Sequence, residues 1–139
     1  TMDELFDKSA LNNAGHLQVT QTETVLYLST AEGKWVKSSL PAEVQYSPAY
    51  AFEPLDFNGD GHLDILFGGN SGSAKIRLGK MDASYGGLLQ GDGKGGFAWV
   101  SNLKSGLAIR GNIRSILQVN DKVLIGVVGE PVKAVTIRK

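Results

Sequence analysis

The sequence predicts an all-β chain built from antiparallel strands, and three observations lead to this fold class. Glycine accounts for 18 of the 139 residues, well above the usual share of about 7%, which indicates many tight turns. Short β-forming segments alternate with turn-forming residues along most of the chain. Two segments also recur at nearly the same spacing, roughly 60 residues. The predicted architecture is a partial β-propeller with about two to two and a half antiparallel four-stranded blades.

The composition excludes several functional classes. The 14 Lys and Arg residues are balanced by 14 Asp and Glu residues, whereas nucleic-acid-binding proteins need a basic excess. No apolar run approaches the roughly 20 residues of a membrane-spanning helix. Cysteine is absent, which excludes disulfides, thiolate zinc sites and cysteine nucleophiles. We therefore expect no nucleic acid partner and no membrane insertion.

The elements can be predicted in order along the chain. Residues 1–15 form an N-terminal segment with a short helix at 3–15, capped by Asp3 and ended by Gly15. Its side chains Leu5, Phe6 and Leu11 are expected to face inward. Nine strands follow within residues 16–139, at 24–29, 35–38, 50–57, 63–68, 85–90, 97–101, 112–119, 123–128 and 132–137. Most connections have hairpin length, as antiparallel pairing requires.

The internal spacing divides these strands into units. Residues 32–35 (EGKW) resemble 93–97 (GKGGF), which makes Trp35 and Phe97 equivalent at a shift of 62, and residues 62–69 align with 122–129 at a shift of 60. We predict an outer hairpin at about 20–40, a complete blade at about 48–103 and a degenerate blade at about 110–139. Trp35 and Phe97 are expected to fill the core. A small β-sandwich is the competing architecture.

A propeller usually has four to eight blades, so this chain cannot close one alone. The chain also starts at Thr1 instead of methionine. We expect it either to be a piece of a longer protein or to pack its open sheet edges against other copies.

Residues 56–64 (DFNGDGHLD) carry the most specific motif. Oxygen-bearing side chains stand at positions 1, 3, 5 and 9, with glycine at position 6. Ca²⁺ takes six to eight oxygen ligands, and glycine at the sixth position allows the sharp bend that brings them together. The predicted ligands are the side chains of Asp56, Asn58, Asp60 and Asp64 and the carbonyl of His62.

This loop is not a helical EF-hand. The twelfth position, where an EF-hand has a bidentate glutamate, is Phe67, and an apolar strand follows in place of a helix. We therefore expect the loop to connect two strands. The alternative is an Asx-rich turn that holds no metal.

The loop and the apolar strand after it resemble the FG-GAP (VCBS) repeat, the blade of integrin-α-like β-propellers. Residues 89–97 resemble the outer hairpin of such blades, and 48–52 and 82–86 resemble segments of bacterial secreted members. The resemblance covers about residues 20–130. It implies a β-propeller, calcium held by residues 56, 58, 60, 62 and 64, and an extracytoplasmic location (secreted, periplasmic or cell surface). The third unit departs from the pattern, since its turn is short and Leu124 replaces the last Asp, so it should bind no metal.

These features favour a non-catalytic calcium-binding module that recognises a protein or carbohydrate ligand or serves as a scaffold. The inferred calcium positions are all filled by protein and no general base lies beside them. An exposed aromatic ring at Tyr46, Tyr50 or Tyr85 would favour sugar or protein binding.

Two alternatives remain open. One is part of a propeller enzyme acting on polysaccharide, with its active site mostly outside this chain; its candidate carboxylates are Glu43, Glu53 and Glu130. The other is a calcium sensor, which needs a large conformational response. Residues 91–96 match G-x-G-x-x-G, but a strand follows in place of a helix, which favours a turn over a dinucleotide site.

Overall fold

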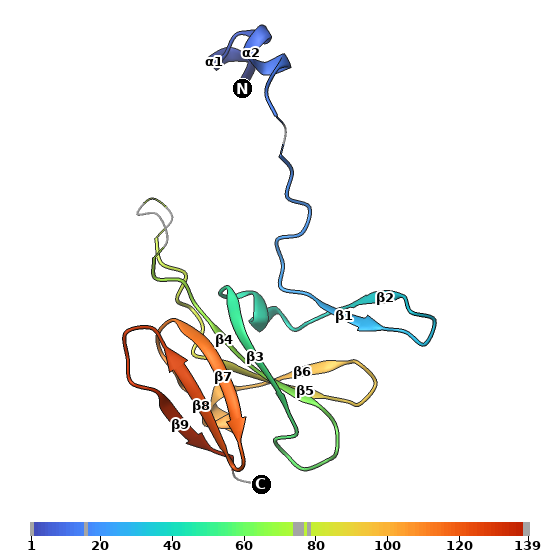
Figure 1. Ribbon diagram of the computed structural model, residues 1–139, viewed down its shortest axis with the longest axis vertical. Coiled ribbons are helices and arrows are strands. Elements are labelled where there is room, and N and C mark those ends of the chain that lie inside the picture. Colours follow the sequence, from blue (N-terminus) through green and yellow to red (C-terminus); the bar gives the residue numbers. More distant parts are fainter. Residues whose placement is uncertain (1, 16, 74–76, 78, 138–139) are drawn as a thin grey trace.

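The computed structural model describes residues 2–15, 17–73, 77 and 79–137. It has a β-rich body and an N-terminal arm, residues 2–15 and 17–23, that leads away from it (Figure 1). At the far end of the arm lie two short helices, α1 (Met2–Leu5) and α2 (Lys8–Asn12). The predicted single helix at 3–15 is therefore interrupted at Phe6 and Asp7. Leu5 is 75% exposed and Phe6 53% exposed, so the prediction that they face inward is wrong: the helices stand apart from the body.

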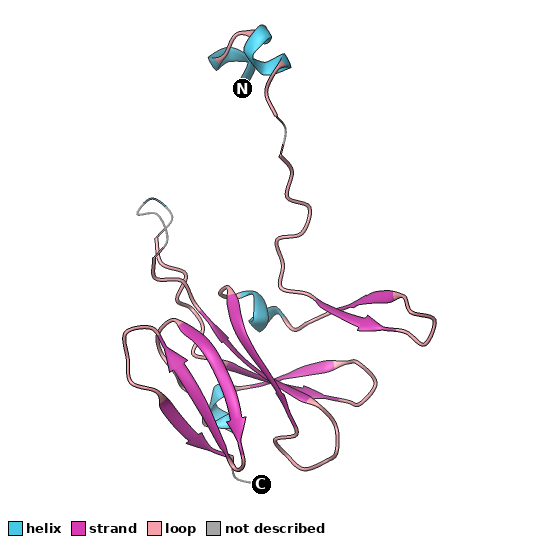
Figure 2. Cartoon of the chain, viewed as in Figure 1, coloured by secondary structure: helices cyan, strands magenta, loops and turns pink. Residues whose placement is uncertain are grey.

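The body is all-β and antiparallel, which confirms the predicted fold class (Figure 2). Each of the nine predicted strands is present with boundaries shifted by two residues or fewer. The strands are β1 (Leu26–Ser29), β2 (Trp35–Ser38), β3 (Ala49–Leu55), β4 (Asp64–Gly69), β5 (Gly87–Gly91), β6 (Phe97–Val100), β7 (Ile113–Val119), β8 (Lys122–Val127) and β9 (Lys133–Thr136). Two further short helices, η1 (Ala42–Gln45) and α3 (Asn102–Ser105), lie in connections.

The strands form three open sheets in sequence order. The hairpin β1–β2 is a two-stranded sheet, β3–β4–β5–β6 form a four-stranded sheet, and β7–β8–β9 form a three-stranded sheet. Among the described residues no sheet closes on itself. Within each sheet, strands that follow one another in the chain are also neighbours in space, so each sheet is a meander.

Two hairpins have the same pairing register. Ser29 pairs with Trp35 across the β1–β2 turn, and Gly91 pairs with Phe97 across the β5–β6 turn, with five residues between the partners in each case. In both turns the first residue donates its backbone N–H to the carbonyl of the fifth. The hairpins that the sequence comparison matched at a shift of 62 are thus paired alike.

The four- and three-stranded sheets share a second local feature. The pairing of β3 with β4 shifts between Ala49 and Ala51, and the pairing of β7 with β8 shifts between Ile113 and Ser115, as at a β-bulge. The residues at the two shifts are Tyr50 and Arg114. Their side chains meet between the sheets, with the Arg114 guanidinium carbon 4.1 Å from the centre of the Tyr50 ring. The two strands β3 and β7 lie side by side.

The main core fills the space between these two sheets. Gly68 of β4 permits the close approach, because a Cβ at this position would lie 2.7 Å from side-chain atoms of Ile113 on β7. Apolar residues on alternating positions of the strands point into the interface. The buried members of this core are Ala51, Leu55, Leu66, Leu88, Leu107, Ile109, Ile113, Ile116, Val123, Ile125 and Val127.

A smaller cluster covers the opposite face of the four-stranded sheet. It is formed by Val44 of η1 with Phe67 and Leu89, and Phe97 packs against it half-buried. Trp35, the counterpart of Phe97, is 69% exposed, so the prediction that it fills the core is wrong. Its hairpin pairs with no third strand in the described structure, and it meets the β5–β6 turn through Ser38, whose hydroxyl donates to Gly95 O at 3.0 Å, which leaves most of the tryptophan uncovered.

Candidate metal centre

The Asp-rich loop connects β3 to β4 at one end of the four-stranded sheet, as predicted for a loop between two strands. Two glycines allow its curvature: Gly59 has a φ of 78° and Gly61 a φ of 82°, which L-residues rarely adopt. All five predicted ligand positions lie in this loop or at the first residue of β4.

The side chains of Asp56 and Asn58 fold back onto the backbone of the loop. Asp56 accepts a hydrogen bond from Gly59 N at 2.7 Å on Oδ1 and one from Gly61 N at 3.0 Å on Oδ2. The amide oxygen of Asn58 accepts from Asp60 N at 3.1 Å. These bonds hold the loop curled with its oxygen atoms on the inside of each turn.

Asp60 accepts hydrogen bonds from two other residues of the loop. Its Oδ1 accepts from His62 N and its Oδ2 from Asn58 Nδ2, both at 2.8 Å. The hydrogen bond from the His62 backbone, followed by that from Asn58, lowers the pKa of Asp60 below its usual value of 3.8. The exposed imidazole of His62 lies on this side too, with Nδ1 3.7 Å from Asp60 Oδ1.

Asp64 has a different environment from the other loop acids because it is fully buried, with 0% exposure. Its Oδ2 accepts from Phe57 N at 3.1 Å, and its Oδ1 accepts from Gly91 N at 2.8 Å. Asp64 thus ties the loop to the end of β5. A Cβ on Gly91 would lie 2.1 Å from the carbonyl oxygen of Leu63, so only glycine fits against the loop at this point.

The loop offers the hard oxygen donors that calcium binds. In this structure, the same carboxylate oxygens accept hydrogen bonds from the loop. Within the described part of the chain, no three Asp, Glu or His side chains are grouped so as to hold a metal ion. Each carboxylate oxygen of Asp56 and Asp60 accepts a hydrogen bond within the loop, and a carboxylate oxygen has a second lone pair that a cation can use. Hard oxygen donors of this kind are the ligands that Ca²⁺ takes.

The other candidate residues lie apart from this loop. Glu43 is on η1, Glu53 on β3 accepts from Gln118 N at 2.8 Å, and Glu130 pairs with Lys133 at 2.7 Å. Each of the three belongs to a different element. The β7–β8 turn consists only of Asn120 and Asp121, and so offers one carboxylate where the β3–β4 loop offers several.

The G-x-G-x-x-G segment is a hairpin turn, as predicted, because β6 follows it directly. Asp92 within it accepts from Lys94 N at 2.7 Å and Gly96 N at 2.9 Å. These backbone hydrogen bonds, first that from Lys94, lower the pKa of the Asp92 carboxyl.

Three tyrosines named from the sequence are all exposed: Tyr46 by 62%, Tyr50 by 52% and Tyr85 by 42%. Tyr50 and Tyr85 each lie beneath an arginine, Arg114 and Arg110 respectively. Elsewhere, none of the helices in the described ranges has the length and apolar character needed to cross a membrane.

Comparisons with protein-family models, with curated proteins and with solved structures find no match to this chain. The resemblance to the FG-GAP repeat therefore rests on the residues of the loop and of the hairpins alone.

Proposed function

We propose that this chain is a non-catalytic, calcium-stabilised recognition module, built as part of a β-propeller of FG-GAP type. The observation that carries the proposal is the β3–β4 loop, which concentrates oxygen donors at the spacing of a calcium loop and is tied to β5 by a buried aspartate. Calcium bound there would add to the stability of the hairpin by mass action.

The arrangement of the sheets supports the propeller interpretation. The four-stranded sheet is a meander in chain order, as a blade is. It stacks face to face on a second meander that carries a bulge at the same place. The hairpin β1–β2 has the register of the outer pair β5–β6, which is the relation expected between successive blades.

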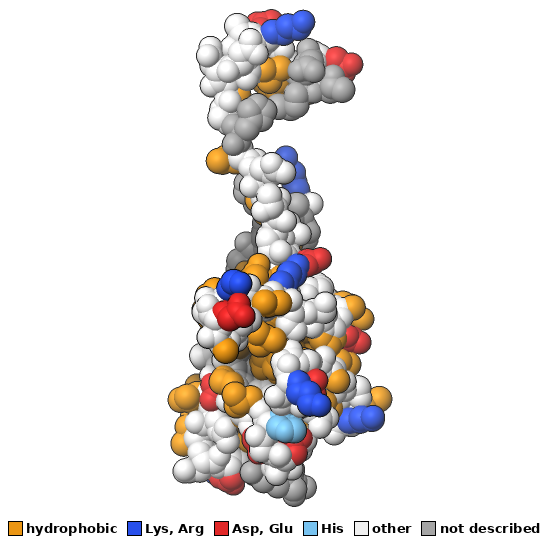
Figure 3. Space-filling model, turned by 90° about the vertical axis from the view of Figure 1, so that its right-hand side faces the viewer, with side chains coloured by type: hydrophobic (Ala, Val, Ile, Leu, Met, Phe, Trp, Pro, Cys, Tyr) orange, Lys and Arg blue, Asp and Glu red, His pale blue; other side chains and the backbone are white. Residues whose placement is uncertain are grey.

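The other face of the four-stranded sheet supports the same interpretation. An apolar groove of about 310 Å³ lies between this face and β1, lined by Val25, Leu40, Phe52 and Ile65 among others. Figure 3 shows apolar side chains gathered on the side of the body where the hairpins lie. In a longer propeller the inner strands of a preceding blade would cover this groove.

The proposed calcium binding supports an extracytoplasmic location for the protein. Extracellular modules typically bind Ca²⁺ with dissociation constants of about 10⁻⁴–10⁻³ M. A site of that affinity is filled outside cells and mostly empty in cytoplasm. The exposed tyrosines favour a sugar or protein ligand over a purely structural role.

Thermal unfolding with millimolar calcium and with a chelator tests the calcium site. Occupancy at about ten times the dissociation constant stabilises the fold by about 1.4 kcal/mol, which should raise the Tm by several degrees. Magnesium should act less, because it demands octahedral geometry and dehydrates reluctantly. Asp60→Asn should lose the calcium effect and Asp121→Asn, in the short turn, should keep it. Equal Tm values with calcium and chelator would contradict the proposal.

We also propose that copies of the chain associate through an open edge of the three-stranded sheet. Among the described residues, β9 pairs on one side only, with β8, and an unpaired edge is a template for another strand. The N-terminal arm of a second copy offers such a strand, since its segment 17–23 is exposed and its apolar residues alternate: Leu17 is 101% and Val19 75% exposed.

A further inference from the structure

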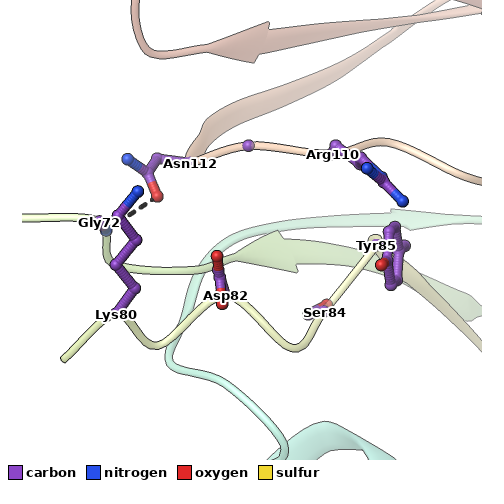
Figure 4. A pocket seen from close by; sticks show the side chains of 8 residues that line it. Gly72, Lys80, Asp82, Ser84, Tyr85, Arg110 and Asn112 are labelled. Carbon is purple, nitrogen blue, oxygen red and sulfur yellow. Dashed lines mark hydrogen bonds between the residues drawn. The ribbon is translucent and has the colours of Figure 1, made fainter.

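The end of the sheets away from the calcium loop contains a polar pocket of about 260 Å³. Figure 4 shows its two walls, the segment before β5 and the segment before β7, which run past each other with side chains directed into the space between them. The side chains on these walls are Lys80, Asp82, Ser84, Tyr85, Arg110 and Asn112.

The walls are joined by one buried side chain, Asn70, which is 1% exposed. Its Nδ2 donates to Ser84 O at 2.7 Å and to Gly111 O at 2.9 Å, and its Oδ1 accepts from Ser84 N at 3.1 Å. Its own carbonyl accepts from the Arg114 guanidinium at 3.0 Å. The pocket is therefore assembled before a ligand arrives, which reduces the ordering cost of binding.

Three hydrogen-bond donors of the pocket have no acceptor among the described residues. The Arg110 guanidinium lies 5.3 Å above the Tyr85 ring and forms no ion pair, and the Lys80 ammonium forms none either. Asn112 uses its Oδ1 to accept from Gly72 N at 3.0 Å, which leaves its Nδ2 available. Arg110 at one end of the pocket fits a carboxylate, and Lys80 and Asn112 at the other end fit further oxygen atoms of the same ligand.

Asp82 further limits the chemical classes of ligand that the pocket can bind. It stands between the cations on the lower wall in Figure 4 and adds one negative charge to the pocket, which disfavours a multiply charged phosphate or sulfate ester. A carboxylate side chain accepts hydrogen bonds from hydroxyl groups. The volume lies below the roughly 300–1,000 Å³ of pockets for drug-sized ligands, and so suits a ligand of about one sugar ring.

We propose that this pocket binds a uronic acid residue of an acidic polysaccharide. Arg110 holds the sugar carboxylate at one end of the pocket, Lys80 and Asn112 donate to sugar oxygens at the other end, and Asp82, between them, accepts from the hydroxyls. The inference deepens the proposed recognition function by naming its substrate class, and it does not depend on calcium, because the pocket and the Asp-rich loop lie at opposite ends of the sheet.

Amide chemical shifts of the ¹⁵N-labelled chain, titrated with D-glucuronate, D-glucose and acetate, test this assignment. The two sugars differ at one position, where glucuronate carries a carboxylate and glucose a CH₂OH group. Glucuronate should shift amides of residues 80–85 and 110–112 and bind roughly tenfold or more tightly than either glucose or acetate. If glucose binds as tightly as glucuronate, the carboxylate contributes nothing to binding. If acetate binds as tightly as glucuronate, the sugar ring contributes nothing. Either result overturns the proposal.

Matched variants locate the site. Arg110→Gln should weaken glucuronate binding by roughly tenfold or more, whereas Lys94→Gln, in the β5–β6 turn at the opposite end, should leave it unchanged. An equal effect of the two substitutions would overturn the proposal. The glucuronate titration is repeated in chelator. If glucuronate still binds but calcium does not raise the Tm, the calcium site is contradicted and the pocket is not. If calcium raises the Tm but glucuronate does not bind, the pocket is contradicted and the calcium site is not.

Discussion

Asp64 illustrates how one residue can belong both to a ligand motif and to the framework. Its spacing in the sequence makes it the last oxygen donor of the loop, and its carboxylate also satisfies the backbone N–H groups of Phe57 and Gly91. Because the residue is fully buried, removal of the carboxylate leaves the buried Gly91 N–H and the part-buried Phe57 N–H without their acceptor.

Asp64→Ala should therefore destabilise the chain even when calcium is absent. Leaving a buried and a part-buried donor without their acceptor costs about 2–4 kcal/mol, measurable by urea unfolding in the presence of chelator. Asp121→Ala, in the exposed β7–β8 turn, is the control and should change the free energy of unfolding by less than about 0.5 kcal/mol. Similar losses for both variants would show that the buried hydrogen bonds contribute little.

Asp92 gives a prediction on the dependence of stability on pH. Backbone N–H groups of Lys94 and Gly96 lower its pKa in the folded state below the usual value of 3.8. Its contribution to the free energy of unfolding is thus complete above the unfolded pKa and is lost as the pH falls through the folded pKa. Between about pH 5 and pH 2 the wild type should lose more stability than Asp92→Asn. Urea midpoints in chelator at both pH values measure this difference, with Asp121→Asn as the control; parallel curves for wild type and Asp92→Asn would contradict it.

At the scale of elements, local signals were sufficient for the strands. Turn glycines and β-branched runs locate all nine, because most strand pairs are closed by short turns; the long connection between β4 and β5, residues 70–86, is the exception. The N-terminal helix could not be predicted in full, since its apolar residues have no partner surface and helices this short depend on packing.

The same contrast applies to the candidate site. The spacing of residues 56–64 predicts a curled loop rich in oxygen donors, and the structure has one. The bond from Gly91 to Asp64 crosses the β4–β5 pair, whose strands are separated by the long connection 70–86, and no pattern in the sequence indicates it. The polar pocket was missed for the same reason, because its walls come from separate connections that only the stacking of the sheets brings together.

Trp35 and Phe97 provide a matched pair for testing the role of the first hairpin. They hold the same register position, but Trp35 is 69% exposed and Phe97 packs half-buried against the Phe67 and Leu89 cluster. Trp35→Ala should change stability by less than about 0.5 kcal/mol, and Phe97→Ala should cost about 1–3 kcal/mol, a part of the 3–5 kcal/mol of a fully buried ring. Chemical denaturation measures both. A large loss from Trp35→Ala would mean that in solution another surface covers this tryptophan.

At the scale of the whole molecule, the four-stranded and three-stranded sheets each end in a strand whose outer edge has no paired strand in the described structure. The four-stranded sheet ends at β6, and the three-stranded sheet ends one strand earlier, at β9. Beside β9 an apolar hollow of about 640 Å³ is lined by Val135, Ile137 and Leu107. A strand added at this edge would gain both backbone pairing and apolar contacts, and the exposed arm of another copy can supply it.

Light scattering over a range of concentrations tests this association. The wild type should show a mass above that of the 14.8 kDa chain as concentration rises, because one arm and one edge per copy form a head-to-tail contact. Ala134→Lys places a charge on β9, and charges on edge strands oppose pairing, so this variant should remain monomeric at the same concentrations with its Tm unchanged. Ala98→Lys places the same charge on β6, whose sheet already has four strands, and should associate like the wild type. If Ala98→Lys abolishes association and Ala134→Lys does not, the contact uses the edge of the four-stranded sheet. If the wild type remains a monomer throughout, the arm and the β9 edge have some other partner.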